Sequence, residues 1–153
     1  MTHKDLVTIA RKWALGRHQI VICEKTSLFE NPDVMGFSWS YSSLIECKIS
    51  MADFYRDKHK MTRGHDGQEN DVCMGNYRIY CAPKGLLIQD NIPDSWGLLE
   101  VYPSGYAKLS TNLYTHRHGA IWWHNLTANA EKSEKRMLFN KILSSHRRGI
   151  YEK

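Results

Sequence analysis

Residues 32–60 read PDVMGFSWSYSSLIECKISMADFYRDKHK and contain the signals around which the rest of the chain is organised. Within this stretch, apolar and β-branched side chains over residues 44–49 predict a strand. Because side chains alternate between the two faces of a strand, Glu46 and Lys48 share one face and Cys47 points to the other. The sequence therefore predicts a carboxylate and an ammonium group on one face, at the end of a largely buried strand.

The preceding apolar run, residues 33–39, is joined to this strand by the short turn at residues 40–42. A connection of this length predicts an antiparallel hairpin. Asp33 shares the face of Glu46 and Lys48 only if it lies opposite one of those two residues, because a shift of one residue turns every side chain to the other face. We therefore expect Asp33 beside Glu46 and Lys48.

Two carboxylates that converge on one point repel each other unless a cation neutralises them. Hard oxygen ligands favour Mg²⁺ or Mn²⁺ over zinc, and magnesium takes only one or two protein carboxylates while water and substrate phosphate complete its shell. Lys48 could orient or help to deprotonate an attacking water, or neutralise charge in phosphodiester cleavage. Taken alone, Glu46 and Lys48 are explained equally well as an ordinary charged pair on an exposed strand face.

These residues resemble the signature of the PD-(D/E)XK nuclease superfamily. The resemblance covers roughly residues 18–110 and follows the segment order of the MmcB-like branch, which is described as DNA-repair-associated. The matching segments are Pro32-Asp33-Val34-Met35, Glu46-Cys47-Lys48-Ile49-Ser50, Asp53-Phe54 with Asp57, Tyr77-Arg78-Ile79-Tyr80 and Trp96-Gly97-Leu98-Leu99. The resemblance implies an α/β fold with the αβββαβ core of the restriction-endonuclease-like fold, a mixed sheet, and an extra C-terminal hairpin and helix.

The same resemblance implies the roles of the central residues. Asp33 and Glu46 would be the metal ligands, the backbone carbonyl of Cys47 would be a further ligand, and Lys48 would be catalytic. Glu24, at the end of a predicted strand, is a second-rank ligand because related nucleases often add an acid from this region. A solvated glutamate at a strand end explains Glu24 equally well.

A helix is predicted after the strand, because Ser50 and Asp53 resemble a capping box. Asp53 is therefore better explained as a helix cap than as a metal contact. The resemblance favours supporting roles beside the site for Asp57 and Lys58.

Basic residues of this region suit contacts with phosphate groups, although a solvated helix face is the alternative explanation. The candidates for nucleic-acid contact are Arg56, Lys60 and Arg63. Tyr77 is a further candidate because its ring could stack on bases, whereas packing in the core is the commoner role of a strand tyrosine. Residues 62–75 are polar and glycine-containing, and are expected to form either a flap beside the nucleic acid or a disordered loop.

The remaining elements are predicted from periodicity and turn signals. We expect a packing helix over residues 4–16, a strand over residues 77–82 parallel to the Glu46 strand, and a hairpin of residues 97–102 and 107–111. A final helix is expected over about residues 128–146. Its inward side chains are predicted to be Met137, Leu138, Ile142 and Leu143.

Composition limits the class of protein. A length of 153 residues favours one domain over residues 1–153, and the net charge of +5 with a pI of about 9.0 favours an anionic partner. The sequence has no apolar run long enough for a membrane span and no signal-peptide core, so we expect a cytoplasmic protein without membrane contact.

These patterns predict a metal-dependent nuclease that hydrolyses DNA, in DNA repair or phage DNA metabolism, with RNA as an open alternative substrate. A homodimer is expected if both strands of a duplex are cut. Two alternatives keep the fold without the chemistry. One is a non-catalytic DNA-binding accessory module, and the other is a protein-interaction subunit, which would show no salt-dependent affinity for DNA.

Overall fold

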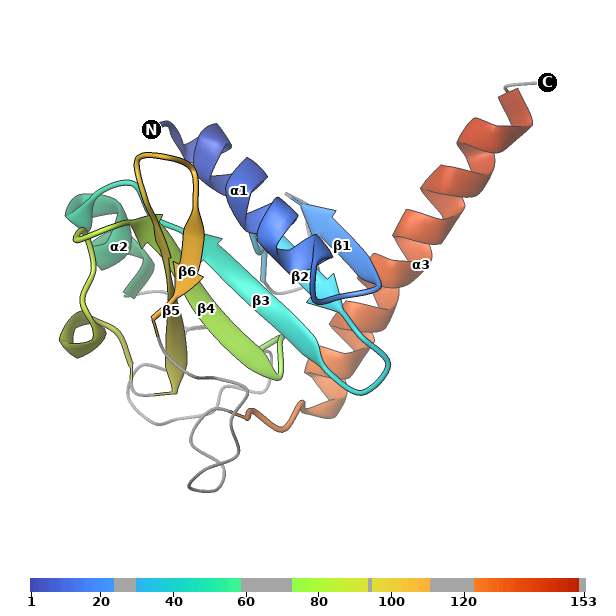
Figure 1. The fold of residues 1–153 in the computed structure, drawn as a ribbon. Helices are drawn as coiled ribbons and strands as arrows, with labels where there is room; N and C mark the ends of the chain where they lie inside the picture. Colours follow the sequence, from blue (N-terminus) through green and yellow to red (C-terminus); the bar gives the residue numbers. More distant parts are fainter. Residues whose placement is uncertain (24–29, 59–72, 94, 111–122, 152–153) are drawn as a thin grey trace.

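The protein has a mixed α/β fold, in which the described residues form one six-stranded sheet and three α-helices (Figure 1). The structure is a computed structural model, and it describes residues 1–23, 30–58, 73–93, 95–110 and 123–151. The elements are α1 (His3–Leu15), β1 (Ile20–Cys23), β2 (Val34–Phe37), β3 (Ser42–Cys47), α2 (Met51–Lys58), β4 (Tyr77–Pro83), a 3-10 turn η2 (Gln89–Asn91), β5 (Trp96–Val101), β6 (Ala107–Leu109) and α3 (Ala128–Tyr151).

The strands lie in the sheet in chain order, from β1 to β6. β1, β2 and β3 form an antiparallel meander, β3, β4 and β5 run parallel, and β6 returns antiparallel to β5. The predicted hairpin at residues 40–42, the parallel pairing of β4 with β3, and the β5–β6 hairpin are therefore confirmed. A sheet with parallel strands at its centre needs cover on both faces.

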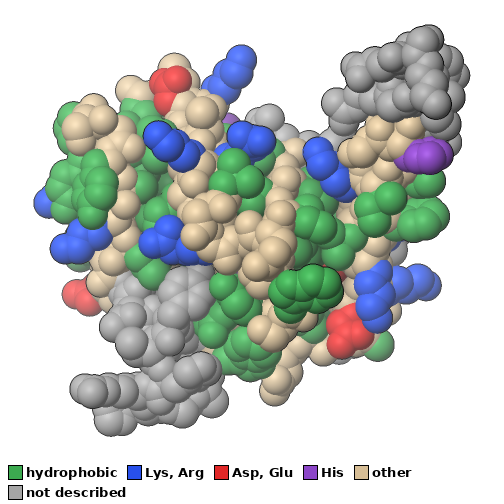
Figure 2. All heavy atoms as spheres, turned by 45° about the vertical axis from the view of Figure 1, so that its right-hand side comes forward, with side chains coloured by type: hydrophobic (Ala, Val, Ile, Leu, Met, Phe, Trp, Pro, Cys, Tyr) green, Lys and Arg blue, Asp and Glu red, His purple; other side chains and the backbone are tan. Residues whose placement is uncertain are grey.

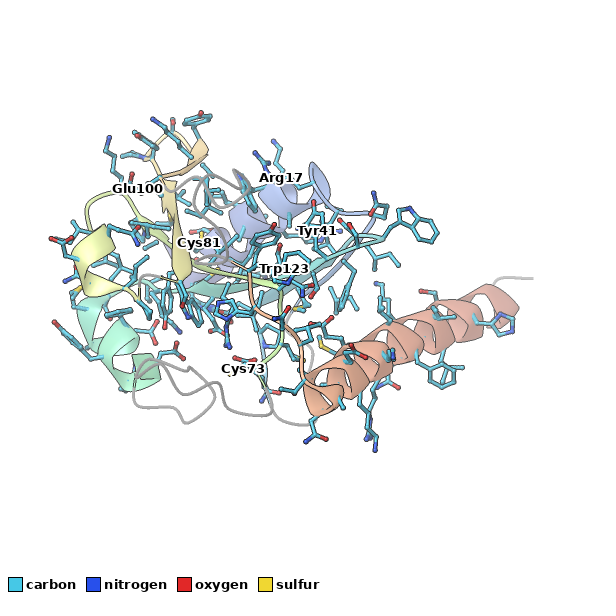
Figure 3. The ribbon with its side chains drawn as sticks, turned by 90° about the horizontal axis from the view of Figure 1, so that it is seen from below. Arg17, Tyr41, Cys73, Cys81, Glu100 and Trp123 are labelled. Carbon is cyan, nitrogen blue, oxygen red and sulfur yellow. The ribbon has the colours of Figure 1, made fainter. Side chains whose placement is uncertain are left out.

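The helices supply that cover in two layers. α1 lies on one face, where its apolar side chains contact Val34, Ile45 and Leu99. α2 and α3 lie on the other face, where Phe54 and Met137 join the second apolar cluster (Figure 3). Because Ile45 and Cys47 point to the α1 face, Glu46 between them points to the face covered by α2 and α3.

α3 begins where it was predicted and continues past the sheet (Figure 1). Met137 is buried, but Ile142 and Leu143 are 60% and 37% exposed, so the prediction that these two side chains point into the core is wrong. Their helical spacing is correct, but the C-terminal half of the helix extends beyond the sheet that would cover them. Figure 2 shows hydrophobic and cationic side chains together on this projecting helix. No helix in the described ranges combines the length and the hydropathy that a membrane span requires.

Candidate functional site

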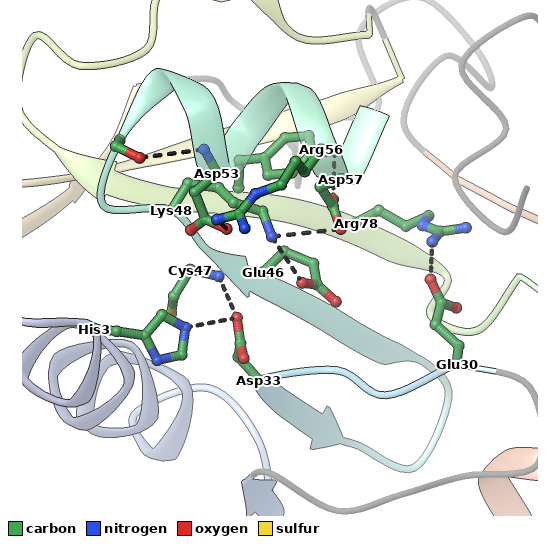
Figure 4. A network of polar contacts seen from close by, with 12 residues as sticks. His3, Glu30, Asp33, Glu46, Cys47, Lys48, Asp53, Arg56, Asp57 and Arg78 are labelled. Atoms are coloured by element: carbon green, nitrogen blue, oxygen red, sulfur yellow. Dashed lines mark hydrogen bonds and ion pairs between the residues drawn. The ribbon is translucent and has the colours of Figure 1, made fainter. Parts of the chain in front are cut away.

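The β2–β3 pairing positions Asp33. Val34 pairs with Ile45 and Met35 with Leu44, so the same register extended by one residue places Asp33 opposite Glu46, one of the two positions that the sequence allows. Asp33 Oδ2 accepts a hydrogen bond of 2.7 Å from the backbone N–H of Cys47. The Asp33 carboxylate is thus held against the carboxyl end of β3 (Figure 4).

Lys48 lies between two carboxylates on the same face of the sheet. Its Nζ is 3.3 Å from Glu46 Oε2 and 3.4 Å from Asp57 Oδ1, and the side chains of Lys48, Glu46 and Asp57 are only 6%, 3% and 1% exposed. The interpretation of Glu46 and Lys48 as a solvated pair on an exposed strand face is therefore wrong. A buried ion pair requires close contacts because both charges have lost their water.

Asp57, for which the resemblance implies a supporting role beside the site, contacts Lys48 directly. α2 brings it there because Phe54, one helical turn earlier, packs into the sheet, and residues three apart lie on one face of a helix. The second carboxylate oxygen of Asp57 accepts a hydrogen bond of 3.1 Å from the hydroxyl of Tyr80. We call Glu46, Lys48, Asp57 and Tyr80 the Lys48 network.

Asp53 and Arg56 lie outside this network. Ser50 Oγ accepts a hydrogen bond of 3.2 Å from the N–H of Asp53 at the start of α2, which supports the capping interpretation. The Asp53 carboxylate is 3.8 Å from the exposed guanidinium of Arg56. Arg56 is therefore available on the outer surface of α2, whereas Asp53 serves the helix terminus.

Arg78 forms a second buried ion pair on the same face, and sequence reasoning gave it no site role. Its Nη2 contacts Glu30 Oε1 at 2.5 Å, and its guanidinium lies 4.5 Å from the centre of the Trp96 ring. The other Glu30 oxygen accepts a hydrogen bond of 3.0 Å from the N–H of Met74. An arginine at an inward-facing strand position signals that a buried acid must exist, but that signal does not identify which acid it is.

Glu134 ties α3 to the opposite end of the β3–β4 pair. Its Oε1 accepts hydrogen bonds of 2.9 Å from the Ser42 hydroxyl and 2.8 Å from the Gly75 N–H. Burial raises the pKa of the Glu134 carboxyl, and these two hydrogen bonds oppose the rise. Glu134 was also missed by the sequence analysis, because nothing local distinguishes it from the other acids of an amphipathic helix.

Two predicted site residues face the other side of the sheet. The Tyr77 ring is buried among the residues that contact α1, edge-on to Tyr41 and Trp123, so its position does not support contact with nucleic acid. The Cys47 side chain also points to that cluster, and its pKa is raised by its hydrogen bond with Cys81 and by burial. Only the backbone of Cys47 reaches the site, where its N–H contacts Asp33.

Four predictions concern groups that the structure does not describe. Glu24, Lys60 and Arg63 lie outside the described residues, and Lys58 ends α2 with a side chain that is also outside them. The predicted flap falls almost wholly in the same undescribed segment.

The acidic side chains of the site are the candidate ligands for a metal ion. Across the described part of the chain, no group of three or more His, Cys, Asp or Glu side chains could hold one. Asp33 and Glu46 supply two carboxylates on paired strands, and Mg²⁺ or Mn²⁺ takes one or two protein carboxylates when water and substrate provide its other ligands. A structural zinc site would require a closed set of four ligands.

No protein-family model matches the chain, and no curated protein matches it. Among solved structures, the chain is similar to the SPO1766 protein of unknown function from Silicibacter pomeroyi. The two share 18% sequence identity with a TM-score of 0.57, over 98% of this chain and 90% of that one. At this identity the similarity shows the fold alone, a mixed α/β architecture that extends over nearly the whole chain.

Proposed function

We propose that the chain is a metal-dependent nuclease that hydrolyses phosphodiester bonds of DNA, and that it belongs to the MmcB-like branch of the PD-(D/E)XK superfamily. The observation that carries the proposal is the placement of Asp33 opposite Glu46, with Lys48 on the same face and buried against Glu46. The order α1-β1-β2-β3-α2-β4 agrees with the αβββαβ core of the restriction-endonuclease-like fold. In this proposal β5, β6 and α3 are additions to that core.

The proposed roles follow from the contacts. Asp33 and Glu46 would hold Mg²⁺ or Mn²⁺, with the Cys47 carbonyl as a further ligand. Such an ion stabilises negative charge on the phosphoryl group during hydrolysis. Lys48 supplies a fixed positive charge near the same point, where it can stabilise developing negative charge or orient the attacking water.

The rest of the Lys48 network keeps that ammonium group in place. Asp57 contacts Lys48 on the side away from the strand, and the Tyr80 hydroxyl donates to Asp57. A preorganised charge needs no rearrangement during the reaction, so this chain of contacts is compatible with a catalytic role for Lys48.

DNA is the proposed substrate class because the chain carries a net charge of +5, and cationic side chains supply the sequence-independent part of DNA affinity. The exposed Arg56 on α2 is one candidate for phosphate contact. With one such site per chain, cutting of both strands of a duplex would favour two copies acting together, so we propose a homodimer for that activity.

A second candidate function is a non-catalytic DNA-binding accessory module with the same fold. The specific observation in its favour is the burial of Lys48, which is 6% exposed and already contacts two carboxylates. An ammonium group neutralised in this way has less charge to offer a substrate. This candidate predicts DNA binding that weakens with salt, and no cleavage.

Cleavage of labelled single-stranded, duplex and flap DNA tests the proposal directly. The native chain should cut at least one substrate with Mg²⁺ or Mn²⁺, and Lys48→Met and Glu46→Gln should lose at least a hundredfold in rate while remaining folded by circular dichroism. Lys135→Met is the matched control because Lys135 forms an exposed ion pair on α3. Salt-sensitive binding by all four proteins without any cutting would favour the accessory module and contradict the nuclease.

A further inference from the structure

The first turn of α1 reaches the proposed metal site. His3 Nε2 lies 3.4 Å from Asp33 Oδ2, and Figure 4 shows the His3 ring extending from the helix toward that carboxylate. The sequence predicts only a packing role for this helix, and its apolar side chains do cover the opposite face of the sheet. His3 is therefore a site residue that the helix carries in addition to its packing face.

His3 is not needed to begin the helix. Thr2 is the N-cap of α1 and forms a complete capping box with Asp5, which satisfies the N-terminal backbone groups without the imidazole. The ring is also 40% exposed, so it contributes little to the core. The contact with Asp33 therefore distinguishes His3 from its neighbours on α1.

The contacts of Asp33 fall on one oxygen. Oδ2 receives the N–H of Cys47 at 2.7 Å and faces His3 Nε2 at 3.4 Å, whereas no contact of Oδ1 is found within the described ranges. The Cys47 N–H holds Oδ2 in place and the His3 ring faces the same oxygen, which leaves Oδ1 for a further ligand. Partners of this kind orient metal-binding carboxylates and typically change metal affinity about 10- to 100-fold.

We propose that His3 is a positioning residue that orients Asp33 for a divalent cation. This inference rests on the proposed function, because it requires Asp33 to be a metal ligand. His3 donates its Nε2–H to Asp33 Oδ2, so that the other oxygen is presented to the ion. Asp33 and His3 are 19% and 40% exposed, so this pair is in contact with solvent, whereas Lys48 and Glu46 are buried.

Mn²⁺ binding tests the role without depending on turnover. The free Mn²⁺ signal in electron paramagnetic resonance gives the dissociation constant for the native chain and its variants in the absence of DNA. His3→Ala and His3→Leu should each weaken binding about tenfold. His3→Gln should recover most of that loss because its amide nitrogen can donate from nearly the same place as Nε2. Lys4→Ala, an exposed neighbour on α1, should remain within twofold of native.

The outcomes separate this inference from the function on which it rests. If Asp33→Asn abolishes Mn²⁺ binding while His3→Ala, His3→Leu and His3→Gln all match the native chain, the positioning role is overturned and the metal site stands. If Asp33→Asn and the native chain bind Mn²⁺ equally, Asp33 is not a ligand, and both the metal site and the role of His3 are overturned. Thermal unfolding of each variant identifies any loss of Mn²⁺ binding that comes from misfolding, and His3→Leu replaces His3→Ala if His3→Ala is unstable.

Discussion

Lys48→Met removes the ammonium group between Glu46 and Asp57 and keeps an unbranched side chain. Each of the two contacts, at 3.3 Å and 3.4 Å, is worth about 5 kcal/mol at the effective dielectric constant of about 20 that describes protein sites. Desolvation of the charges offsets much of this attraction in the native chain. In the variant, however, two carboxylates remain buried without their cation, and breaking a buried pair in this way costs about 3–5 kcal/mol.

Urea unfolding at pH 7 in the presence of a chelator measures this loss. Lys135→Met is the matched control, because Lys135 Nζ lies 3.4 Å from Glu131 Oε2 but its side chain is 77% exposed. An exposed pair contributes no more than about 1 kcal/mol, so the control should unfold close to the native midpoint. The two substitutions thus compare a buried ion pair with an exposed one at nearly the same distance between nitrogen and oxygen.

Added Mg²⁺ should restore more stability to Lys48→Met than to the native chain, because a cation that binds only the folded state stabilises it and would replace the missing charge. If Lys48→Met lowers the free energy of unfolding by less than about 1 kcal/mol in the presence of the chelator, the reasoning is refuted. Such a result would mean that Glu46 and Asp57 are neutral or hydrated when Lys48 is absent.

Three further predictions concern the packing and the titration of buried groups. Gly36→Ala should lower the free energy of unfolding by about 1–3 kcal/mol in urea, because its Cβ would lie 2.4 Å from the His18 ring; an unchanged midpoint would show that the ring moves freely. Burial lowers the pKa of His18 from 6.5 to about 4, so between these pH values the unfolded chain binds a proton that the folded chain does not. The free energy of unfolding should therefore fall by up to about 3 kcal/mol as the pH drops through this range. His18→Gln should lose this part of the pH dependence, and a pH profile identical to that of the native chain would contradict the prediction. The pKa of the Glu134 carboxyl is raised by burial, so its ionised form is disfavoured in the folded chain. Glu134→Gln should therefore be at least as stable as the native chain at neutral pH, and the difference should vanish in acid. Glu134→Ala should lower the free energy of unfolding by about 1–3 kcal/mol because it leaves hydrogen-bond donors without an acceptor, and equal losses in both variants would contradict this.

The sequence predicts the centre of the fold well because the relevant signals are local. Alternation within β3 places Glu46 and Lys48 together, and the short turn before it limits Asp33 to a position opposite Glu46 or Lys48, of which the structure has the first. Helical spacing likewise places Phe54 and Asp57 on one face of α2, although the direct contact of Asp57 with Lys48 depends on how closely the helix packs against the sheet.

The predictions fail where partners come from distant segments. Glu30 with Arg78 and Glu134 with Ser42 join elements far apart in the chain, and no periodicity indicates which acid meets which donor. His3 belongs to the same class, because its ring reaches the site only through the crossing of α1 over the sheet. Ile142 fails for a different reason, since helical periodicity identifies an apolar stripe without showing where the covering sheet ends.

Asp33 and Glu46 must share one divalent cation if the chain is the proposed nuclease. An anomalous difference map from crystals soaked in Mn²⁺ tests this most directly. We predict a peak within about 2.2 Å of one carboxylate oxygen from each residue, the distance expected for a small hard cation. A map with no peak between these two side chains, from crystals in which Mn²⁺ is visible elsewhere, would contradict the metal site and with it the proposed hydrolysis.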